Sequence, residues 1–212
     1  MTVVNTDPHS SQPVLHHGPP PAAARLTVVL VHGRGDSAAG ILSLTQEFDA
    51  DDVAWVAPQA AGHSWYPYSF LASLERNEPF VTSALGVLRR LIDELETTGV
   101  SAERCVLMGF SQGACLVSEF AARHARRYGG VVVLSGGLIG AAVTPRDYAG
   151  TCDGTPVLIG CSDIDPHIPL QRVQETAEVF RRLNAKVDQR IYPNMAHTIN
   201  TDEIAAIAAM LR

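Results

Sequence analysis

The sequence CVLMGFSQGACLVSEFAA, residues 105–122, decides the fold, because a buried-strand pattern, a glycine-rich turn and a helical pattern follow one another in it. The continuous apolar run 105–110 is typical of a strand covered on both faces. Gly109-Phe110-Ser111-Gln112-Gly113 then matches G-x-S-x-G. A serine that projects from a tight strand-to-helix turn needs small residues two positions before and after it, since the backbone is crowded there. We therefore predict that Ser111 is a nucleophile on such a turn; an ordinary glycine-rich turn is the alternative.

The alternation of short apolar runs and helical patterns continues along the chain in both directions. Other strand-like runs are 26–31, 53–57, 131–134, 157–160 and, more weakly, 187–191, with a short leading strand expected near Val14 and Leu15. Apolar residues recur at helical spacing in 80–95, 170–183 and 204–211, the last with Thr201 as its expected N-cap. This order predicts an α/β domain with a mostly parallel central sheet and helices on both faces. In such domains the functional residues collect at the carboxyl ends of the strands.

Length and composition narrow the class of protein. The 212 residues are expected to form one domain, residues 25–212, preceded by a tail with the short leading strand, residues 1–24. A net charge of −6 without a basic tract argues against nucleic acid and membrane surfaces as partners. The four cysteines show no CxxC pair or metal-ligand spacing, and the first residues lack a secretory pattern, which indicates a cytoplasmic protein. The sequence leaves open whether the chain forms a homodimer.

A serine nucleophile needs a general base and an acid that orients the base. The run 157–160 is followed by CSDIDPHIP, in which Asp163 and Asp165 compete for the role of the acid. We favour Asp165, which stands at the start of the next helix; a turn or capping aspartate is the alternative for either. His197 alone among the histidines lies between the last strand and the last helix, so it is the expected base. The other candidates are expected to be solvated in the N-terminal segment or to lie at a helix end: His9, His16, His17 and His124.

The run 26–31 leads into His32-Gly33-Arg34-Gly35-Asp36, a glycine-bounded turn that exposes backbone N–H groups. Such groups stabilise the oxyanion that forms during acyl transfer. The expected donors are the backbone N–H groups of Arg34 and Gln112, while the side chain of His32 is expected to support the turn.

The same turn admits a different class of function. Residues 33–38 satisfy G-x-G-x-x-A, a relaxed dinucleotide fingerprint, but the next strand-like run ends without the acid that would hold a ribose. Dinucleotide binding is therefore the weaker hypothesis. No other motif in the sequence asks for a cofactor or a metal.

Taken together, these segments resemble the α/β-hydrolase fold and, within it, the phospholipase/carboxylesterase family. The segments that carry the resemblance are HGRGD (32–36), APQA (57–60), GFSQGA (109–114), SGGL (135–138), DPHIP (165–169) and PNMAH (193–197). The resemblance implies a Ser-Asp-His triad, and the family's D-x-x-V/I-P setting matches Asp165 and not Asp163. The spacing between the segments leaves no room for a large lid domain, so a minimal form of the fold is expected.

The expected function is that of a serine carboxylesterase that hydrolyses short- to medium-chain acyl esters, a small-molecule substrate class, through an acyl-enzyme on Ser111. An acyl-thioesterase or a lysophospholipase of the same fold is the alternative, because the family includes all three. A catalytically inactive binding module is the alternative from another class.

Two features bear on the substrate. The family often has Leu where this chain has Arg34, whose guanidinium is expected either to point to solvent or to pair with a carboxylate or phosphate of the substrate. The aromatic loop 58–78 follows a strand's carboxyl end and should border the active site. His63, Trp65 and Tyr66 are its candidate substrate contacts; packing of the aromatic side chains onto the domain is the alternative.

Overall fold

A seven-stranded sheet forms the centre of the computed structural model, which describes residues 7–212. Its strands are β1 (Val14–His17), β2 (Leu26–Val31), β3 (Val53–Pro58), β4 (Cys105–Phe110), β5 (Gly130–Leu134), β6 (Pro156–Ser162) and β7 (Lys186–Tyr192). The spatial order is β1-β3-β2-β4-β5-β6-β7. Every neighbouring pair is parallel except β1 with β3. The prediction of a mostly parallel sheet is thus confirmed.

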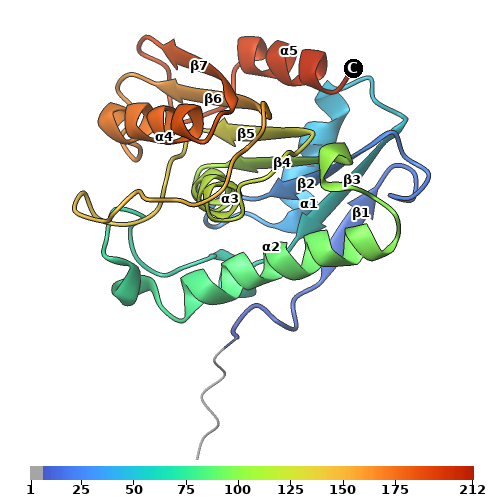
Figure 1. Ribbon diagram of the computed structural model, residues 1–212, viewed down its shortest axis with the longest axis horizontal. Helices are drawn as coiled ribbons and strands as arrows, with labels where there is room; N and C mark the ends of the chain where they lie inside the picture. The colour runs from blue at the N-terminus through green and yellow to red at the C-terminus, as the bar shows by residue number, and fades with distance from the viewer. Residues whose placement is uncertain (1–6) are drawn as a thin grey trace, which may run out of the picture.

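Helices cover both faces of this sheet. The α-helices are α1 (Ala38–Leu42), α2 (Phe80–Thr97), α3 (Gln112–Arg123), α4 (Leu170–Arg182) and α5 (Thr201–Met210), and the 3₁₀ turns are η1 (Ser43–Glu47), η2 (Ala61–His63), η3 (Leu74–Asn77) and η4 (Ala102–Arg104). One apolar core joins the sheet to α2, α3 and α4, and a second joins it to α1 and α5. In Figure 1 the strands accordingly lie between α5 above and α2 below. This is the α/β-hydrolase arrangement that the sequence predicts.

Burial explains why some strands are more evident than others in the pattern of apolar residues. The central strands β4 and β5 are buried at nearly every position because helices cover both of their faces, so they show as continuous apolar runs. β7 lies at the edge of the sheet and exposes Lys186 and Asp188. Its apolar signal is correspondingly weak.

The described part of the N-terminal segment packs onto the domain. β1 pairs with β3. His9 is only 1% exposed, its Nε2 donates to the Trp65 carbonyl at 3.0 Å, and its Nδ1 accepts from the Ala61 N–H at 3.0 Å. The expectation of a solvated His9 is therefore wrong, because the imidazole satisfies two backbone groups of the aromatic loop. His16 and His17 are exposed, as expected.

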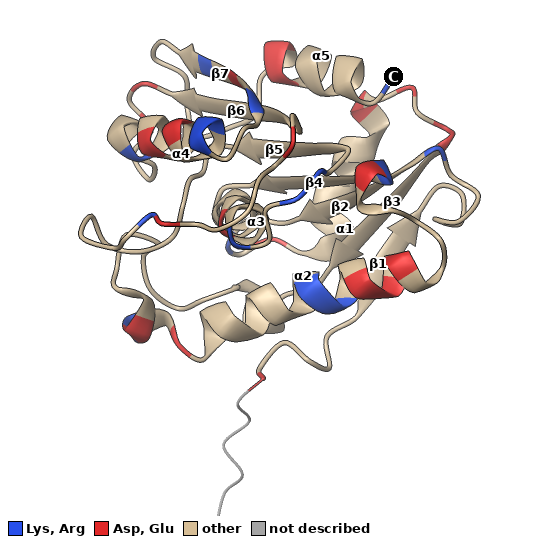
Figure 2. Cartoon of the chain, in the orientation of Figure 1, with Lys and Arg blue, Asp and Glu red and all other residues tan. Residues whose placement is uncertain are grey.

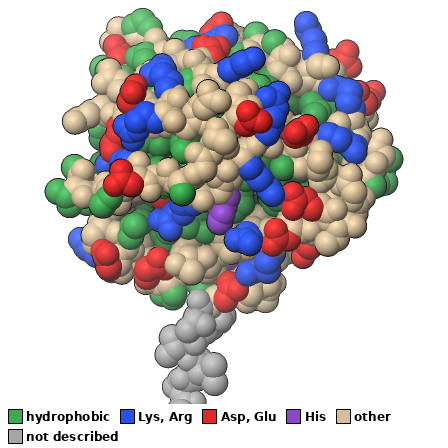
Figure 3. Space-filling model, viewed as in Figure 1, with side chains coloured by type: hydrophobic (Ala, Val, Ile, Leu, Met, Phe, Trp, Pro, Cys, Tyr) green, Lys and Arg blue, Asp and Glu red, His purple; other side chains and the backbone are tan. Residues whose placement is uncertain are grey.

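Charged residues of both signs are spread over the molecule. Figure 2 shows acidic and basic residues on α2, on α4 and in the loops between elements. In Figure 3 they are interspersed with neutral side chains across the face in view. Among residues 7–212, no helix combines the length and apolar character needed to span a bilayer.

Candidate active site

Ser111 occupies a strained turn between β4 and α3. Its φ of 54° and ψ of −118° lie outside the regions that a serine ordinarily adopts. A Cβ atom at Gly109 would lie 2.5 Å from the carbonyl carbon of Gly113, and one at Gly113 would lie 2.2 Å from the Val31 oxygen. Glycine is therefore required at both positions on steric grounds, as the G-x-S-x-G pattern predicts.

The structure brings Ser111, His197 and Asp165 into a hydrogen-bonded row. His197 Nε2 lies 2.9 Å from Ser111 Oγ, and His197 Nδ1 lies 2.7 Å from Asp165 Oδ2. With Nδ1–H donating to the carboxylate, Nε2 is free to accept the serine proton. The three residues follow β4, β7 and β6, and their loops meet at the carboxyl edge of the sheet.

Asp165 is held in its ionised form by its hydrogen bonds. Burial raises the pKa of this carboxyl, but the hydrogen bond from His197 and those from the backbone N–H groups of His167 and Ile168 outweigh burial, so the pKa is lowered. The two backbone donors lie 2.8 and 3.0 Å from Oδ1. The carboxylate is thus fixed by the start of the segment that leads into α4.

Asp163 has a different set of partners. Its Oδ1 accepts from the Asn194 N–H at 2.8 Å, and its own N–H donates to the Tyr192 carbonyl. It therefore ties the loop after β6 to the loop that carries His197. Of the two competing aspartates, only Asp165 is hydrogen-bonded to the imidazole.

The turn after β2 lies directly against Ser111. A Cβ atom built on Gly33 would lie 3.5 Å from Ser111 Cβ. Within residues 7–212, the backbone N–H groups of Arg34 and Gln112 have no hydrogen-bond acceptor. His32 Nδ1 donates to the Gly33 carbonyl at 2.7 Å and its Nε2 accepts from the Ala60 N–H, so it supports the turn as expected. Burial lowers the pKa of His32, which favours its neutral form.

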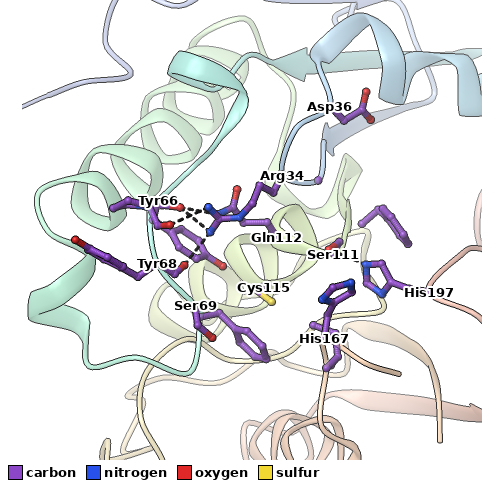
Figure 4. Close-up of a pocket in the computed structure, with 15 residues that line it drawn as sticks. Arg34, Asp36, Tyr66, Tyr68, Ser69, Ser111, Gln112, Cys115, His167 and His197 are labelled. Atoms are coloured by element: carbon purple, nitrogen blue, oxygen red, sulfur yellow. Dashed lines mark hydrogen bonds between the residues drawn. The ribbon is translucent and has the colours of Figure 1, made fainter. Parts of the chain in front are cut away.

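A cavity of about 510 Å³ opens beside Ser111. Its lining combines apolar and polar side chains from five parts of the chain: Gly33, Arg34, Asp36, Tyr66, Pro67, Tyr68, Ser69, Phe70, Phe110, Ser111, Gln112, Cys115, His167, Ile168 and His197. Figure 4 shows His167 and His197 next to each other at one side of the cavity and the aromatic loop at the other. The aromatic loop thus borders the site, as expected.

Two of the three predicted substrate contacts are misplaced. Tyr66 lines the cavity, but Trp65 and His63 do not. Trp65 is fully buried and its Nε1 donates to the His32 carbonyl at 2.9 Å, while His63 Nδ1 donates to the Asp36 carbonyl at 2.8 Å. Both side chains thus hydrogen-bond to the segment after β2, and for the buried Trp65 this is the packing role that the sequence left as the alternative.

The side chain of Arg34 is exposed and lies in the cavity lining, but its hydrogen bonds are made to the protein. Its guanidinium donates to three successive carbonyls, those of Tyr66, Pro67 and Tyr68, at 2.8–2.9 Å. Figure 4 shows the side chain directed at that stretch of backbone. The hydrogen-bonding capacity that would meet a substrate anion is largely used by the protein itself.

Cys115 and His167 line the cavity although the sequence did not mark them. Cys115 stands four residues after Ser111 on α3, so helical spacing alone places it on the same face. Burial raises the pKa of its thiol to about 12, which keeps it protonated. The described residues contain no cluster of three or more His, Cys, Asp or Glu side chains that could hold a metal ion.

Known proteins resemble this chain in sequence and in fold. A sequence profile of the phospholipase/carboxylesterase family matches residues 18–212. The crystal structure of a phospholipase/carboxylesterase from Dyadobacter fermentans is similar, with a TM-score of 0.91 and 42% identity over 95% of this chain and 96% of that one. Acyl-protein thioesterase 1 of Gibberella zeae is 29% identical over 91% of this chain and 92% of its own length. Lysophospholipase-like protein 1 of Mus musculus is 26% identical over 87% and 85%.

The matched region contains the sheet from β2 onward, the turn at Ser111 and the segments that carry Asp165 and His197. The fold and the positions of the sequence motifs therefore both agree with the family match. On these grounds the chain belongs to the phospholipase/carboxylesterase family.

Proposed function

We propose that this protein is a serine carboxylesterase that hydrolyses short- to medium-chain acyl esters through an acyl-enzyme on Ser111. The observation that carries the proposal is the continuous row of hydrogen bonds from Ser111 Oγ through His197 to Asp165, with distances of 2.9 and 2.7 Å, at the wall of an open cavity. Membership of a hydrolase family supports it.

In the first half of the reaction, His197 Nε2 takes the proton of Ser111 as Oγ attacks the ester carbonyl carbon. The carbonyl oxygen becomes an oxyanion, for which the free backbone N–H groups of Arg34 and Gln112 are the donors. Asp165 stabilises the imidazolium that forms. When the tetrahedral intermediate collapses, the carbon–oxygen bond to the alcohol breaks and His197 returns its proton to the departing oxygen.

In the second half, water replaces the alcohol. His197 Nε2 takes a proton from the water as its oxygen attacks the acyl carbon, and the same two N–H groups receive the second oxyanion. Breaking the bond to Oγ releases the carboxylic acid and returns the proton to Ser111. Every proton is thus accounted for by the chain's own residues and one water molecule.

The cavity supports the choice of acyl group. A volume of about 510 Å³ lies within the range of small-molecule sites, and apolar residues such as Phe70, Phe110 and Ile168 contribute to its lining. An ester of a small molecule in the cytoplasm is the substrate that we propose, without nucleic acid or membrane as partner. An acyl-thioester is the second candidate, because relatives over most of this chain's length bear the name acyl-protein thioesterase.

The test is hydrolysis of p-nitrophenyl acetate and butyrate in the presence of EDTA. The parent protein should turn over both esters, and Ser111→Ala should lower kcat by at least about 10⁴-fold, because the nucleophile is lost. Ser101→Ala, at an exposed serine before η4, is the matched control and should retain activity. Equal activity in Ser111→Ala and the parent would refute the proposal. The ratio of kcat/KM for phenyl butyrate to that for S-phenyl thiobutyrate shows whether the protein prefers an alcohol or a thiol as the leaving group.

A further inference from the structure

The two residues proposed to bind the oxyanion through their backbones also hold one wall of the cavity through their side chains. The wall segment, residues 64–68, precedes η3 in the aromatic loop. Gln112 Oε1 accepts from the Trp65 N–H at 2.9 Å, and Gln112 Nε2 donates to the Tyr66 carbonyl at 2.8 Å. Arg34, in the turn after β2, donates to the same segment at the three carbonyls of residues 66–68.

The Tyr66 carbonyl is the point at which these contacts meet. Its oxygen accepts from Arg34 at 2.9 Å, from Gln112 at 2.8 Å and from the Ser64 hydroxyl at 2.9 Å. Three donors on one carbonyl oxygen exceed its two lone pairs, so little freedom is left to the peptide group. The turn after β2, the turn after β4 and the wall segment are therefore linked at a single atom.

Arg34 also determines the local electrostatics. The negative ends of three successive carbonyl dipoles converge on its guanidinium, and without a cation they would repel one another. A guanidinium offers several N–H donors in a rigid fork, which suits this set of acceptors better than a flexible ammonium does. On the opposite side the Tyr68 N–H donates to Asn77 Oδ1 at 2.9 Å, which fixes the far end of the wall segment.

From these contacts we infer that the Arg34 side chain is a positioning residue that holds the wall segment against the oxyanion turn and so sets the acyl-chain preference, rather than a site for a substrate anion. The inference rests on the proposed esterase function. Tyr66 and Tyr68 belong both to the wall segment and to the cavity lining, so a loosened segment changes the width of the cavity. A long acyl group would contact this wall over more of its length than an acetyl group. Its binding is therefore weakened more when the wall moves.

The kinetic test compares Arg34→Leu and Arg34→Lys with the parent on p-nitrophenyl acetate, butyrate, octanoate and hemisuccinate. For Arg34→Leu we expect KM for the octanoate to rise about tenfold, with a smaller effect on the acetate and with kcat less affected than KM. Butyrate and hemisuccinate have the same acyl length, so kcat/KM should fall by similar factors for both. Arg34→Lys should recover part of the loss, since it restores the charge but not the fork.

A second readout is independent of catalysis. Hydrogen exchange of backbone amides in residues 64–70 should accelerate about tenfold in Arg34→Leu, less in Arg34→Lys, and not in Arg89→Leu, an exposed arginine on α2 that serves as the matched control. Unchanged exchange in an active Arg34→Leu variant would overturn the positioning role of Arg34 alone. An inactive parent protein would overturn the esterase function and, with it, the proposed acyl-chain preference.

Two kinetic outcomes would also overturn the inference. A fall in kcat/KM for the hemisuccinate about tenfold greater than for the butyrate would show that Arg34 binds a substrate anion. An equal fall for all four esters through kcat would show that the side chain shapes the oxyanion turn itself.

Discussion

At the scale of single residues, the two carboxylate oxygens of Asp165 have separate partners. Oδ2 accepts from His197, and Oδ1 accepts from two backbone N–H groups, those of His167 and Ile168. Because the backbone fixes the carboxylate, the carboxylate can fix the plane and the tautomer of the imidazole. A neutral amide in its place would keep the shape but could present an N–H group to His197 Nδ1.

We predict that Asp165→Asn lowers kcat by about 10² to 10⁴-fold with a small effect on KM, because the imidazole is left in the wrong tautomer. Asp163→Asn should have a much smaller effect, since Asp163 binds the Asn194 N–H and not the imidazole. Steady-state kinetics on p-nitrophenyl butyrate check both variants, with circular dichroism as the control for folding. If Asp163→Asn were the more damaging change, the acid would have to be reassigned.

The residues of the candidate site were predictable from sequence to different degrees. Ser111, Asp165 and His197 each follow a strand in the chain order that is typical of the α/β-hydrolase fold, so local pattern made them candidates, and the family's D-x-x-V/I-P setting added to the choice of Asp165 over Asp163. The partners of Arg34 are carbonyls more than 30 residues away, and nothing in the composition of either segment indicates that pairing. Trp65 and His63 were misplaced because an aromatic residue in a loop looks the same from sequence whether it faces the cavity or packs beneath it.

At the scale of elements, the start of α5 combines a helix cap with a buried acid. Asn200, one residue before the expected Thr201, is the N-cap, and it forms a reciprocal capping box with Glu203. Glu203 is fully buried against β6, where a Cβ atom at Gly160 would lie 2.0 Å from its Oε1. Burial raises the pKa of the Glu203 carboxyl to about 7, although the hydrogen bond from the Asn200 N–H opposes the rise.

This acid gives the stability of the fold a defined dependence on pH. A carboxyl whose pKa is higher in the folded than in the unfolded chain contributes stability that is present below the ordinary value of 4.5 and is lost as the pH rises toward about 7. Glutamine keeps the neutral form at every pH. We therefore predict that the free energy of unfolding of Glu203→Gln, relative to the parent, increases between about pH 5 and pH 8, by at most about 3 kcal/mol.

Chemical denaturation of both proteins at several pH values measures this difference. Exposed carboxyls contribute equally to the two proteins and cancel. A difference that stays constant across the range would mean that Glu203 is ionised in the fold at all of these pH values.

The secondary structure shows where sequence patterns suffice. Strands and helices that are buried along most of their length were predicted within a few residues of their observed bounds. Helix α1, Ala38–Leu42, was missed because five residues are too short to show a helical period. Its N-cap Ser37 accepts from the Gly40 N–H, a local signal that is common in turns as well.

At the scale of the whole molecule, the strand order assembles the site. β4 lies between β2 and β5, so the turns that carry Arg34 and Gln112 are neighbours. β6 and β7 are adjacent, which brings the loops with Asp165 and His197 together. The sheet therefore places these four loops, together with the aromatic loop after β3, around one cavity at its carboxyl edge.

The most direct test of the account is the reaction of the protein with a fluorophosphonate probe, followed by mass spectrometry of the intact chain and of its peptides. The probe reacts with a serine only when a base activates it, so labelling reports the Ser111–His197 pair without a choice of substrate. We predict a single adduct per chain, on Ser111, that is absent in Ser111→Ala and forms far more slowly in His197→Ala. A parent protein that stays unlabelled, or a Ser111→Ala variant that is labelled equally, would contradict the assignment of Ser111 as an activated nucleophile.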